Sequence, residues 1–342
     1  MKPGSTEGIE KGTVTSHETG AKALALSSPA YLAGRPIRHA LVLGGTGFIG
    51  TPLMRSLGDA GVRTTCLVHR MPLQSQISAV QVVRGSLDRY PWHTLERDAP
   101  DVVFHLARIP GRGGLRGALT RVRNRLANER LVLALAALPR PPLVVFIGGT
   151  LAYGSHTDEL ITESTPLAPT SFSRDYHAAE LPWLTAQRTN DVPVMIARPA
   201  WVLGRGSWFA AFYQRVIQAE RYVPQYGDGE NWMSLVHVED CASFLLYYAQ
   251  SGLPGSAVNV FAGAPIRQRE LSERLARLTG LPVRRISLEE MERRFDRAVR
   301  QAFEFSARIG TVHSALHAGF RGRHRDLDRD LEDLLLAEPV QG

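Results

Sequence analysis

Apolar residues recur with two different periods along this chain of 342 residues. Short apolar runs, typical of buried strands, alternate with longer amphipathic segments that are typical of helices. Because strands and helices alternate and crossover connections are right-handed, the pattern predicts an α/β fold: a doubly wound parallel sheet of the Rossmann type with helices on both faces. The predicted strands span residues 39–43, 63–68, 80–84, 101–106, 143–147 and 192–197, and the predicted helices span 51–60, 118–138 and 173–189.

The same pattern predicts how the chain is divided. Residues 1–36 show neither period and are rich in Gly, Ser, Thr and Lys, so we expect a disordered N-terminal extension. Residues 37–199 are expected to form a nucleotide-binding domain, with residues 234–250 also packing on it. Residues 200–233 and 251–342 are expected to form a smaller α/β substrate-binding region.

Composition narrows the class of protein. A content of 44% hydrophobic and 21% charged residues is that of a globular protein. Cys66 and Cys241 lie in apolar runs, which predicts buried free thiols in a reducing cytoplasm. No apolar stretch approaches the roughly 20 residues needed to span a bilayer, so no membrane association is expected. The net charge of +7 comes with no recognisable nucleic-acid module, and we expect no nucleic-acid partner.

A glycine motif follows the first predicted strand. GGTGFIG (residues 44–50) stands between this strand and the first predicted helix, with glycines at Gly44, Gly47 and Gly50. The first glycine allows a tight turn, the second lets the backbone approach a pyrophosphate, and the third lets helix and strand pack closely. This placement predicts a dinucleotide site. The backbones expected to hold the pyrophosphate are those of Gly44, Gly47, Phe48 and Ile49.

The end of the second predicted strand bears on the choice of cofactor. An acidic side chain at this point would bind the adenosine ribose hydroxyls, but the chain has His69 and Arg70 there. Positive charge favours a 2′-phosphate, so NADP is predicted, with NAD as the alternative. A surface pair without any ligand is the other interpretation of these two residues.

Several further motifs, in order, resemble the extended short-chain dehydrogenase/reductase family of the NAD-dependent epimerase/dehydratase type. They are RGSLD (84–88), VVFHLAR (102–108), VVFIGGTLAYG (144–154), ITESTPLAPTS (161–171), RPAWVLGRG (198–206) and YGDGENWMSLVHVEDCA (226–242). The resemblance runs from about residue 37 to about residue 335 and implies a nicotinamide cofactor. The further residues that it implies along the cofactor are Ser86, Leu87, Leu106, Ala107, Ile147, Tyr176, Pro199 and Val202.

The chain departs from this family where acid–base chemistry is expected. The family uses Tyr-x-x-x-Lys followed four residues later by Glu, yet the lysines of this chain are Lys2, Lys11 and Lys22. Matching Glu180 to the family glutamate puts Phe172 at the tyrosine and Tyr176 at the lysine. An alternative register makes Tyr176 the catalytic tyrosine and puts Glu180 at the lysine. Neither register recovers a lysine, and arginine does not replace an amine whose pKa is tuned by its surroundings.

The usual catalytic Ser or Thr is also displaced. Its position falls on Gly149, and Thr150 would face the other side of a regular strand unless the chain bends at Gly148 and Gly149. Arg108, at the end of the fourth predicted strand, is placed to hold an anionic or enolate oxygen. We therefore take Tyr176, Thr150 and Arg108 as catalytic candidates, with a tyrosine packed between helices as the other interpretation of Tyr176.

Other polar residues in these motifs are expected to be structural. His105 belongs to a buried strand, Tyr153 matches a scaffold position, and His237 matches a scaffold motif. No metal site is expected. Where family members that act on sugar nucleotides carry an arginine for the diphosphate, this chain has Met233. Aromatic residues crowd the same segments, which favours an apolar or aromatic small-molecule substrate. They are Trp201, Trp208, Phe209, Phe212, Tyr213 and Trp232.

Together these features favour an NAD(P)H-dependent reductase of an activated C=C, C=N or quinone-like acceptor in specialised metabolism. Such acceptors take hydride first and obtain a proton later from solvent or their own hydroxyl, which makes the missing pair tolerable. The alternatives are a non-redox isomerase, cyclase or dehydratase on the same fold, and a binding protein that senses NADP. The family resemblance also implies a homodimer that pairs helices 118–138 and 173–189.

Overall fold

A computed structural model describes residues 36–73, 79–96, 99–109, 114–156, 158–170 and 173–337. Its centre is a parallel seven-stranded sheet in the order β11-β7-β5-β4-β1-β2-β3. The doubly wound α/β fold predicted from the sequence is confirmed. The bounds are β1 (His39–Leu43), β2 (Arg63–Val68), β3 (Val80–Arg84), β4 (Val102–His105), β5 (Leu143–Ile147), β7 (Val194–Pro199) and β11 (Ala257–Val260).

The strand order reverses between β1 and β4. From β1 the chain proceeds outward to β2 and β3, and it then returns to β4 on the other side of β1. In sheets of this kind ligands bind at the carboxyl ends of the strands beside this reversal. The glycine motif follows β1 directly, so the fold places it at the expected binding edge.

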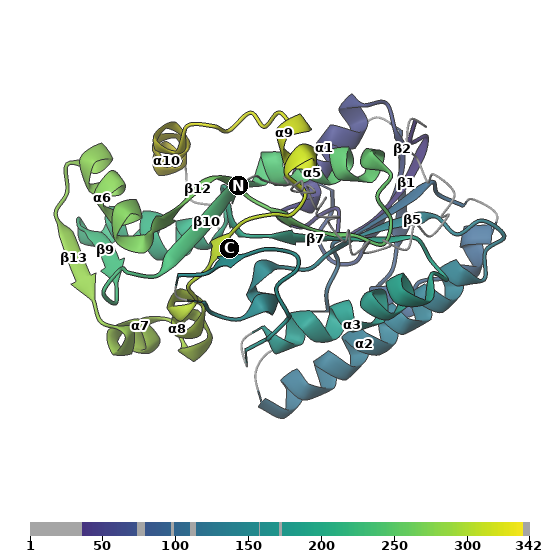
Figure 1. Cartoon of the computed structure of the whole chain (residues 1–342), viewed down its shortest axis with the longest axis horizontal. Coiled ribbons are helices and arrows are strands. Elements are labelled where there is room, and N and C mark those ends of the chain that lie inside the picture. Colours follow the sequence, from purple (N-terminus) through teal and green to yellow (C-terminus); the bar gives the residue numbers. More distant parts are fainter. Residues whose placement is uncertain are drawn as a thin grey trace, which may run out of the picture.

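Helices cover both faces of the sheet (Figure 1). One face carries α1 (Gly50–Asp59) and α5 (Val238–Ser251), which pack on each other as well as on the sheet. The opposite face carries α2 (Gly114–Ala136) and α3 (Arg174–Thr189), which run side by side. Each helical layer forms its own apolar core with the sheet. Burial of these two cores is the main stabilising contribution.

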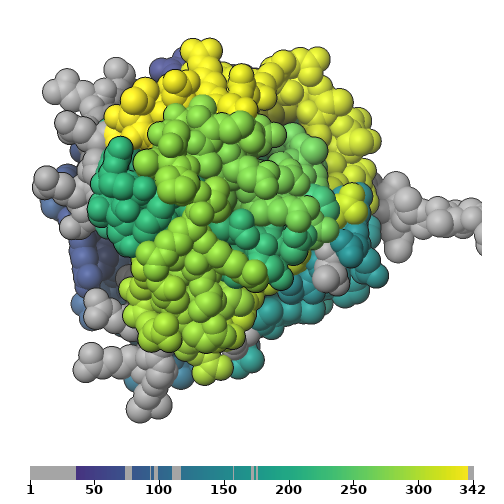
Figure 2. Space-filling model, turned by 90° about the vertical axis from the view of Figure 1, so that its left-hand side faces the viewer, coloured from purple at the N-terminus to yellow at the C-terminus, as the bar shows by residue number. Residues whose placement is uncertain are grey.

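The C-terminal region forms a second, smaller α/β unit, green to yellow in Figure 1, and its residues face the viewer in Figure 2. Its strands form a sheet β12-β10-β8 and two parallel pairs, β13 with β9 and β14 with β6. The strands are β6 (Leu160–Ile161), β8 (Trp201–Leu203), β9 (Val223–Tyr226), β10 (Trp232–His237), β12 (Ala262–Arg267), β13 (Val283–Ile286) and β14 (Arg308–Ile309). The helices are α4 (Arg215–Glu220), α6 (Gln268–Thr279), α7 (Leu288–Arg294), α8 (Arg297–Glu304), α9 (Ser314–Gly319) and α10 (Leu327–Leu336).

One expected boundary needs correction. Residues 251–342 were expected in the substrate-binding region, but β11 pairs in parallel with β7 and forms an edge of the large sheet. The short apolar run 257–260 does not by itself indicate which sheet it joins, because the strand it pairs with lies far away in the sequence. Residues 1–35 of the expected extension lie outside the described residues. Within the part of the chain described, no helix has the length and apolar character needed to cross a bilayer.

Candidate functional site

The turn after β1 requires glycine because backbone segments meet there. Gly44 has φ of +92°, and a Cβ on it would lie 2.8 Å from the amide nitrogen of Ala107. A Cβ on Gly50 would overlap the carbonyl oxygen of Gly44. The amide of Gly47 donates to that same carbonyl at 3.0 Å and closes the turn. The motif therefore brings the start of α1 directly against the ends of β1 and β4.

The N-terminus of α1 has the properties of an anion site. Ile49 precedes the helix, and within the described residues no side chain caps its first amides. Its first turn contains no acidic residue, and Phe48 beside it is 38% exposed. The amide groups at the start of a helix and the positive end of the helix dipole favour a phosphate group. This geometry fits the pyrophosphate predicted for Gly44, Gly47, Phe48 and Ile49.

The expected adenosine end lies at the ends of β2 and β3. His69 and Arg70 directly follow β2, and both are exposed. After β3, the Ser86 hydroxyl donates to Asp88 at 2.7 Å, and Arg123 of α2 forms an ion pair with the same carboxylate. The hydrogen bonds from Arg123 and Ser86 lower the pKa of Asp88 to about 2. Leu87 between them is buried.

The expected nicotinamide end is formed by the carboxyl ends of β4, β5 and β7. Leu106 and Ala107 follow β4, Ile147 ends β5 and Pro199 ends β7. Pro199 is buried, whereas the other three are half-buried, as is Val202 on the adjoining strand β8. The fold thus brings every residue that the resemblance placed at this end to one edge of the sheet.

Arg108 and Tyr176 meet at this edge. The guanidinium carbon of Arg108 lies 3.8 Å from the centroid of the Tyr176 ring, a cation–π contact between the segment after β4 and the first turn of α3. Tyr176 is half-buried and Arg108 is exposed. Two of the predicted catalytic candidates are therefore in contact. Phe172, which one register places at the tyrosine, lies outside the described residues.

Glu180 belongs to a buried polar network instead of the cofactor edge. Arg198 donates to its carboxylate through Nη2 at 2.7 Å and Nε at 3.1 Å, and both side chains are buried. Arg198 also donates to the Tyr153 hydroxyl, which donates to Asn259. Burial raises the pKa of Tyr153. Glu180 is thus one partner of a buried ion pair, and the choice between the two registers stays a prediction.

The expected bend at Gly148 and Gly149 is present, and it brings the hydroxyl of Thr150 to Pro199, one of the residues at the expected nicotinamide end. β5 ends at Ile147, and a 3₁₀ turn begins at Thr150. Thr150 is buried, and its hydroxyl donates to the carbonyl of Pro199 at 3.3 Å. Gly149 is extended, with φ of −179°, and a Cβ there would have no atom of the described residues within 4 Å. Gly149 thus has room for a side chain.

His105 is a core residue, as expected. It is fully buried on β4, and its Nε2 lies 2.7 Å from Oδ1 of Asn128, which also accepts from Trp183 Nε1 at 2.7 Å. Burial lowers the pKa of His105 to about 4, so the ring is neutral at physiological pH. One turn earlier on α2, the Asn124 side chain binds both the N–H and the C=O of Ile109 at 2.8 Å.

Sequence reasoning missed these two asparagines. Their signal is an amide side chain at positions i and i+4 on the buried face of a helix whose other face carries arginines. They connect α2 to the segment that carries Arg108, so they belong to the support of the site.

The aromatic residues of the C-terminal region are divided between core and edge. Met233 is fully buried, so its position contributes to the core and offers no charge. Trp201 and Trp208 are half-buried and meet edge to face with centroids 5.0 Å apart. Trp232 instead lies against the guanidinium of Arg267 at 3.8 Å. Phe209 and Tyr213 are buried and stacked, and Phe212 packs partly buried on the same core.

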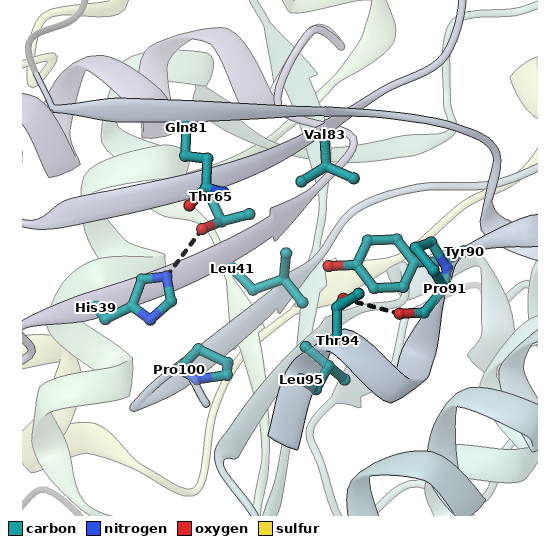
Figure 3. A pocket seen from close by; sticks show the side chains of 10 residues that line it. All are labelled: His39, Leu41, Thr65, Gln81, Val83, Tyr90, Pro91, Thr94, Leu95 and Pro100. Atoms are coloured by element: carbon teal, nitrogen blue, oxygen red, sulfur yellow. Dashed lines mark hydrogen bonds between the residues drawn. The ribbon is translucent and has the colours of Figure 1, made fainter. Parts of the chain in front are cut away.

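A separate cavity of about 200 Å³ lies away from this edge (Figure 3). It lies near the amino-terminal ends of the strands of the large sheet. There His39 begins β1, and its Nε2 lies 2.9 Å from the hydroxyl oxygen of Thr65. Apolar side chains such as Leu41, Val83 and Leu95 line the rest. Its position at the opposite ends of the strands sets it apart from the predicted dinucleotide site.

Comparisons with known proteins agree with this geometry. Residues 40–260 match the model of the NAD dependent epimerase/dehydratase family. The low-salt glycan biosynthesis protein Agl12 of Haloferax volcanii is 26% identical over 70% of this chain and 82% of its own length. A dTDP-glucose 4,6-dehydratase of Streptomyces niveus is 24% identical over 70% of this chain and 77% of its own length.

Solved structures show the same fold at low identity. A putative epimerase from Burkholderia cenocepacia superposes with a TM-score of 0.70 at 21% identity, covering 88% of this chain and 98% of that one. The dTDP-glucose 4,6-dehydratase of Streptomyces venezuelae, solved with NAD, has a TM-score of 0.68 at 20% identity, covering 87% and 95%. A human epimerase family protein solved with NADPH has a TM-score of 0.68 at 18% identity, covering 87% and 99%.

Proposed function

Because this chain belongs to the NAD dependent epimerase/dehydratase family, we propose that it uses a nicotinamide dinucleotide to reduce a largely apolar small molecule. The observation that carries this proposal is the contact of Arg108 with Tyr176 at the carboxyl edge of the sheet. This edge has an intact glycine turn, and no residue of the chain after position 22 is a lysine. The chemistry must therefore run without the usual Tyr–Lys pair.

The cofactor assignments follow from the ends of the strands. The amides around Gly47 would bind the pyrophosphate, and Leu106, Ala107, Ile147, Pro199 and Val202 would line the nicotinamide end. Arg70 and His69 would bind a 2′-phosphate, which makes NADP the preferred form. When bound, the cofactor supplies hydride. Neighbouring structures contain NAD in one case and NADPH in another, so the dinucleotide class is supported by both.

Arg108 and Tyr176 would handle charge on the acceptor. A positive guanidinium beside the reacting edge stabilises negative charge that develops on an acceptor oxygen. The Tyr176 hydroxyl is the ionisable group next to it and would position the ribose or donate a proton. Thr150 contributes less than expected, because its hydroxyl is bound to Pro199. A quinone-like or conjugated acceptor suits these residues, because the anion formed by hydride transfer is stable and can be protonated in a later step.

The substrate surface supports an apolar molecule. β8 begins at Trp201, two residues after β7 ends, and the half-buried rings of Trp201 and Trp208 pack on the core of the C-terminal region. Met233 offers no charge for a diphosphate at the position where sugar-nucleotide enzymes place an arginine. We therefore favour an aromatic or otherwise apolar acceptor, as in specialised metabolism.

A second candidate is sugar-nucleotide chemistry, favoured by the relatives named dTDP-glucose 4,6-dehydratase. Loss of water needs an acid for the departing hydroxyl. The segment 148–154 after β5 offers only Thr150 and the buried Tyr153 for that role. Incubation with dTDP-glucose, with 4-keto product as the readout, distinguishes this candidate from the reductase.

Binding of NADPH and NADH tests the proposal. Fluorescence transfer from tryptophan to the reduced nicotinamide should show saturable NADPH binding. Removing a charged hydrogen bond costs about 1.5–3 kcal/mol, so Arg70→Ala should weaken NADPH binding roughly 10- to 100-fold. NADH, which lacks the 2′-phosphate, should bind both proteins equally and is the internal control.

Turnover is then measured with 2,3-dimethyl-1,4-naphthoquinone as the acceptor. Oxidation of NADPH that depends on this quinone supports a reductase. Saturable binding without oxidation of NADPH by any acceptor of the conjugated classes would contradict the reductase proposal, and absence of dinucleotide binding would contradict the cofactor assignment.

We also propose a homodimer through α2 and α3. Leu119, Val122, Leu126 and Leu133 are 45–70% exposed and follow one face of α2 at spacings of three, four and seven residues. An exposed apolar stripe of this kind is typical of a helix that packs against a partner.

A further inference from the structure

Two histidines and a glutamate from distant parts of the chain converge beside the start of α5. His237 and Glu239 flank the first residue of this helix, and His324 comes from the segment between α9 and α10. One ligand atom from each of the three lies within 4.8 Å of the others. The two imidazole rings are stacked, with centroids 3.4 Å apart, so the His237 ring must turn to aim a nitrogen at an ion that lies in the plane of the His324 ring.

The spacing suits a metal ion better than a direct ion pair. Nε2 of His324 lies 3.5 Å from Oε2 of Glu239, whereas a charge-assisted hydrogen bond is typically about 2.7–2.9 Å. Ligand atoms at about 2.0–2.1 Å from a tetrahedral ion are separated by about 3.3 Å. Arg55 approaches the other carboxylate oxygen, Oε1, at 3.4 Å and leaves Oε2 directed at His324.

His324 is held in the orientation that a metal ligand needs. Its Nδ1 lies 2.7 Å from the Asp330 carboxylate, so the ring donates there and presents Nε2 on the other side. A carboxylate behind a ligating histidine is the usual outer partner of protein metal sites. Asp240 fixes the backbone as well, because its carboxylate accepts the amides of Arg323 and His324 at 2.8 and 3.0 Å.

We propose that His237, Glu239 and His324 bind a divalent transition-metal cation of the zinc class. Imidazole nitrogens select such ions over magnesium and calcium, which prefer oxygen. Three protein ligands leave one position for water. None of the three side chains is among the residues assigned to the dinucleotide above, so the proposal is independent of the activity proposed above. The proposal differs from the expectation from the sequence, which included no metal site.

One existing hydrogen bond limits the affinity. Nδ1 of His237 accepts the Glu239 amide at 3.3 Å and caps α5. Coordination through Nδ1 would occupy the acceptor of this bond, and coordination through Nε2 would place a proton on it, so the cap is lost in either case, at about 1 kcal/mol. We therefore expect micromolar binding, weaker than that of a structural zinc finger.

The bound ion would join the C-terminal segment to the nucleotide-binding domain. Glu239 belongs to a helix of the large sheet's outer layer, and His324 lies 85 residues later in the chain. Arg321, Arg323 and Arg325 are exposed around His324, so trypsin can report on this junction.

The test uses the full chain without an affinity tag, stripped of metal with a chelator. Calorimetric titration with Zn²⁺ should show one saturable site, and Mg²⁺ should show none. His324→Ala and Glu239→Gln should abolish micromolar binding. Asp330→Asn, which preserves shape, should weaken binding roughly 10- to 100-fold. The control His313→Ala, outside the cluster, should bind as the wild type does.

Trypsin provides a second readout that needs no activity. Zn²⁺ should slow cleavage at Arg321 to Arg325 in the wild type and in His313→Ala, and leave the rate in Asp330→Asn nearly unchanged at the same concentration. Absence of saturable binding, or equal affinity in the wild type and Glu239→Gln, would overturn the site. Failure of the metal site would leave the proposed NADPH-dependent activity standing, because that activity is tested separately.

Discussion

The buried imidazole of His105 makes a quantitative prediction about stability and pH. Burial lowers its pKa from 6.5 to about 4, whereas the unfolded chain keeps the ordinary value. Between these two values the unfolded state binds more protons than the folded state. Stability contributed by the neutral ring is therefore complete above about pH 6.5, falls as the pH drops through this window, and is level again below about pH 4.

The size of the effect follows from the difference between the two pKa values. Each unit corresponds to 1.36 kcal/mol, so a shift of about 2.5 units corresponds to about 3 kcal/mol. His105→Gln removes the titrating group and keeps an amide that can donate to Asn128. The variant should be less stable at neutral pH, because its side chain packs less well against Phe146 and Trp183.

Urea unfolding at about pH 8 and about pH 4 measures this difference. The free energy of unfolding of the wild type should fall by about 3 kcal/mol more than that of His105→Gln over this range. His313→Gln, a half-buried residue just before α9, is the control and should follow the wild type. If the free energy of unfolding changed with pH equally in the wild type and in His105→Gln, the assignment of a neutral, buried ring would be refuted.

Three further predictions concern the site and the assembly. Gly50→Ala should raise the NADPH Kd at least about tenfold, because its Cβ overlaps Gly44, whereas Gly149→Ala should leave it unchanged; calorimetry compares the two variants. Tyr176→Phe keeps the ring contact with Arg108, so cofactor binding should persist while turnover falls about 10²-fold or more if the hydroxyl donates a proton; equal turnover would assign that proton to solvent. Leu126→Glu on the exposed stripe of α2 should convert a dimer to a monomer in light scattering, and a wild-type monomer would contradict the proposed dimer.

Local patterns were sufficient to predict the centre of the fold. The first glycine turn and the strands at 39–43, 63–68, 80–84 and 143–147 were predicted with the bounds that the structure has, since each depends on neighbouring residues alone. The same local logic correctly separated buried His105 from the exposed Arg108 three residues later. Boundaries shifted by one to four residues where turns and caps decide them, as at the start of α2.

Contacts between distant residues were beyond such reasoning. The assignment of β11 to the large sheet depends on pairing with β7, about sixty residues earlier. The hydrogen bond from the hydroxyl of Thr150 to the carbonyl of Pro199, 49 residues later, is a contact of the same long-range kind. His324 could not be linked to Glu239 because nothing in the local sequence around either residue specifies the other.

Asn124 and Asn128 have a mechanical consequence. Through them α2 holds the backbone of Ile109 on one turn and the side chains of His105 and Trp183 on the next. Tilting or sliding of this helix must therefore stretch hydrogen bonds to both β4 and α3. We expect the helix and this edge of the sheet to move together. A displacement of α2, for example when a partner binds its outer face, would therefore move Ile109. The guanidinium of the preceding residue, Arg108, would shift with it.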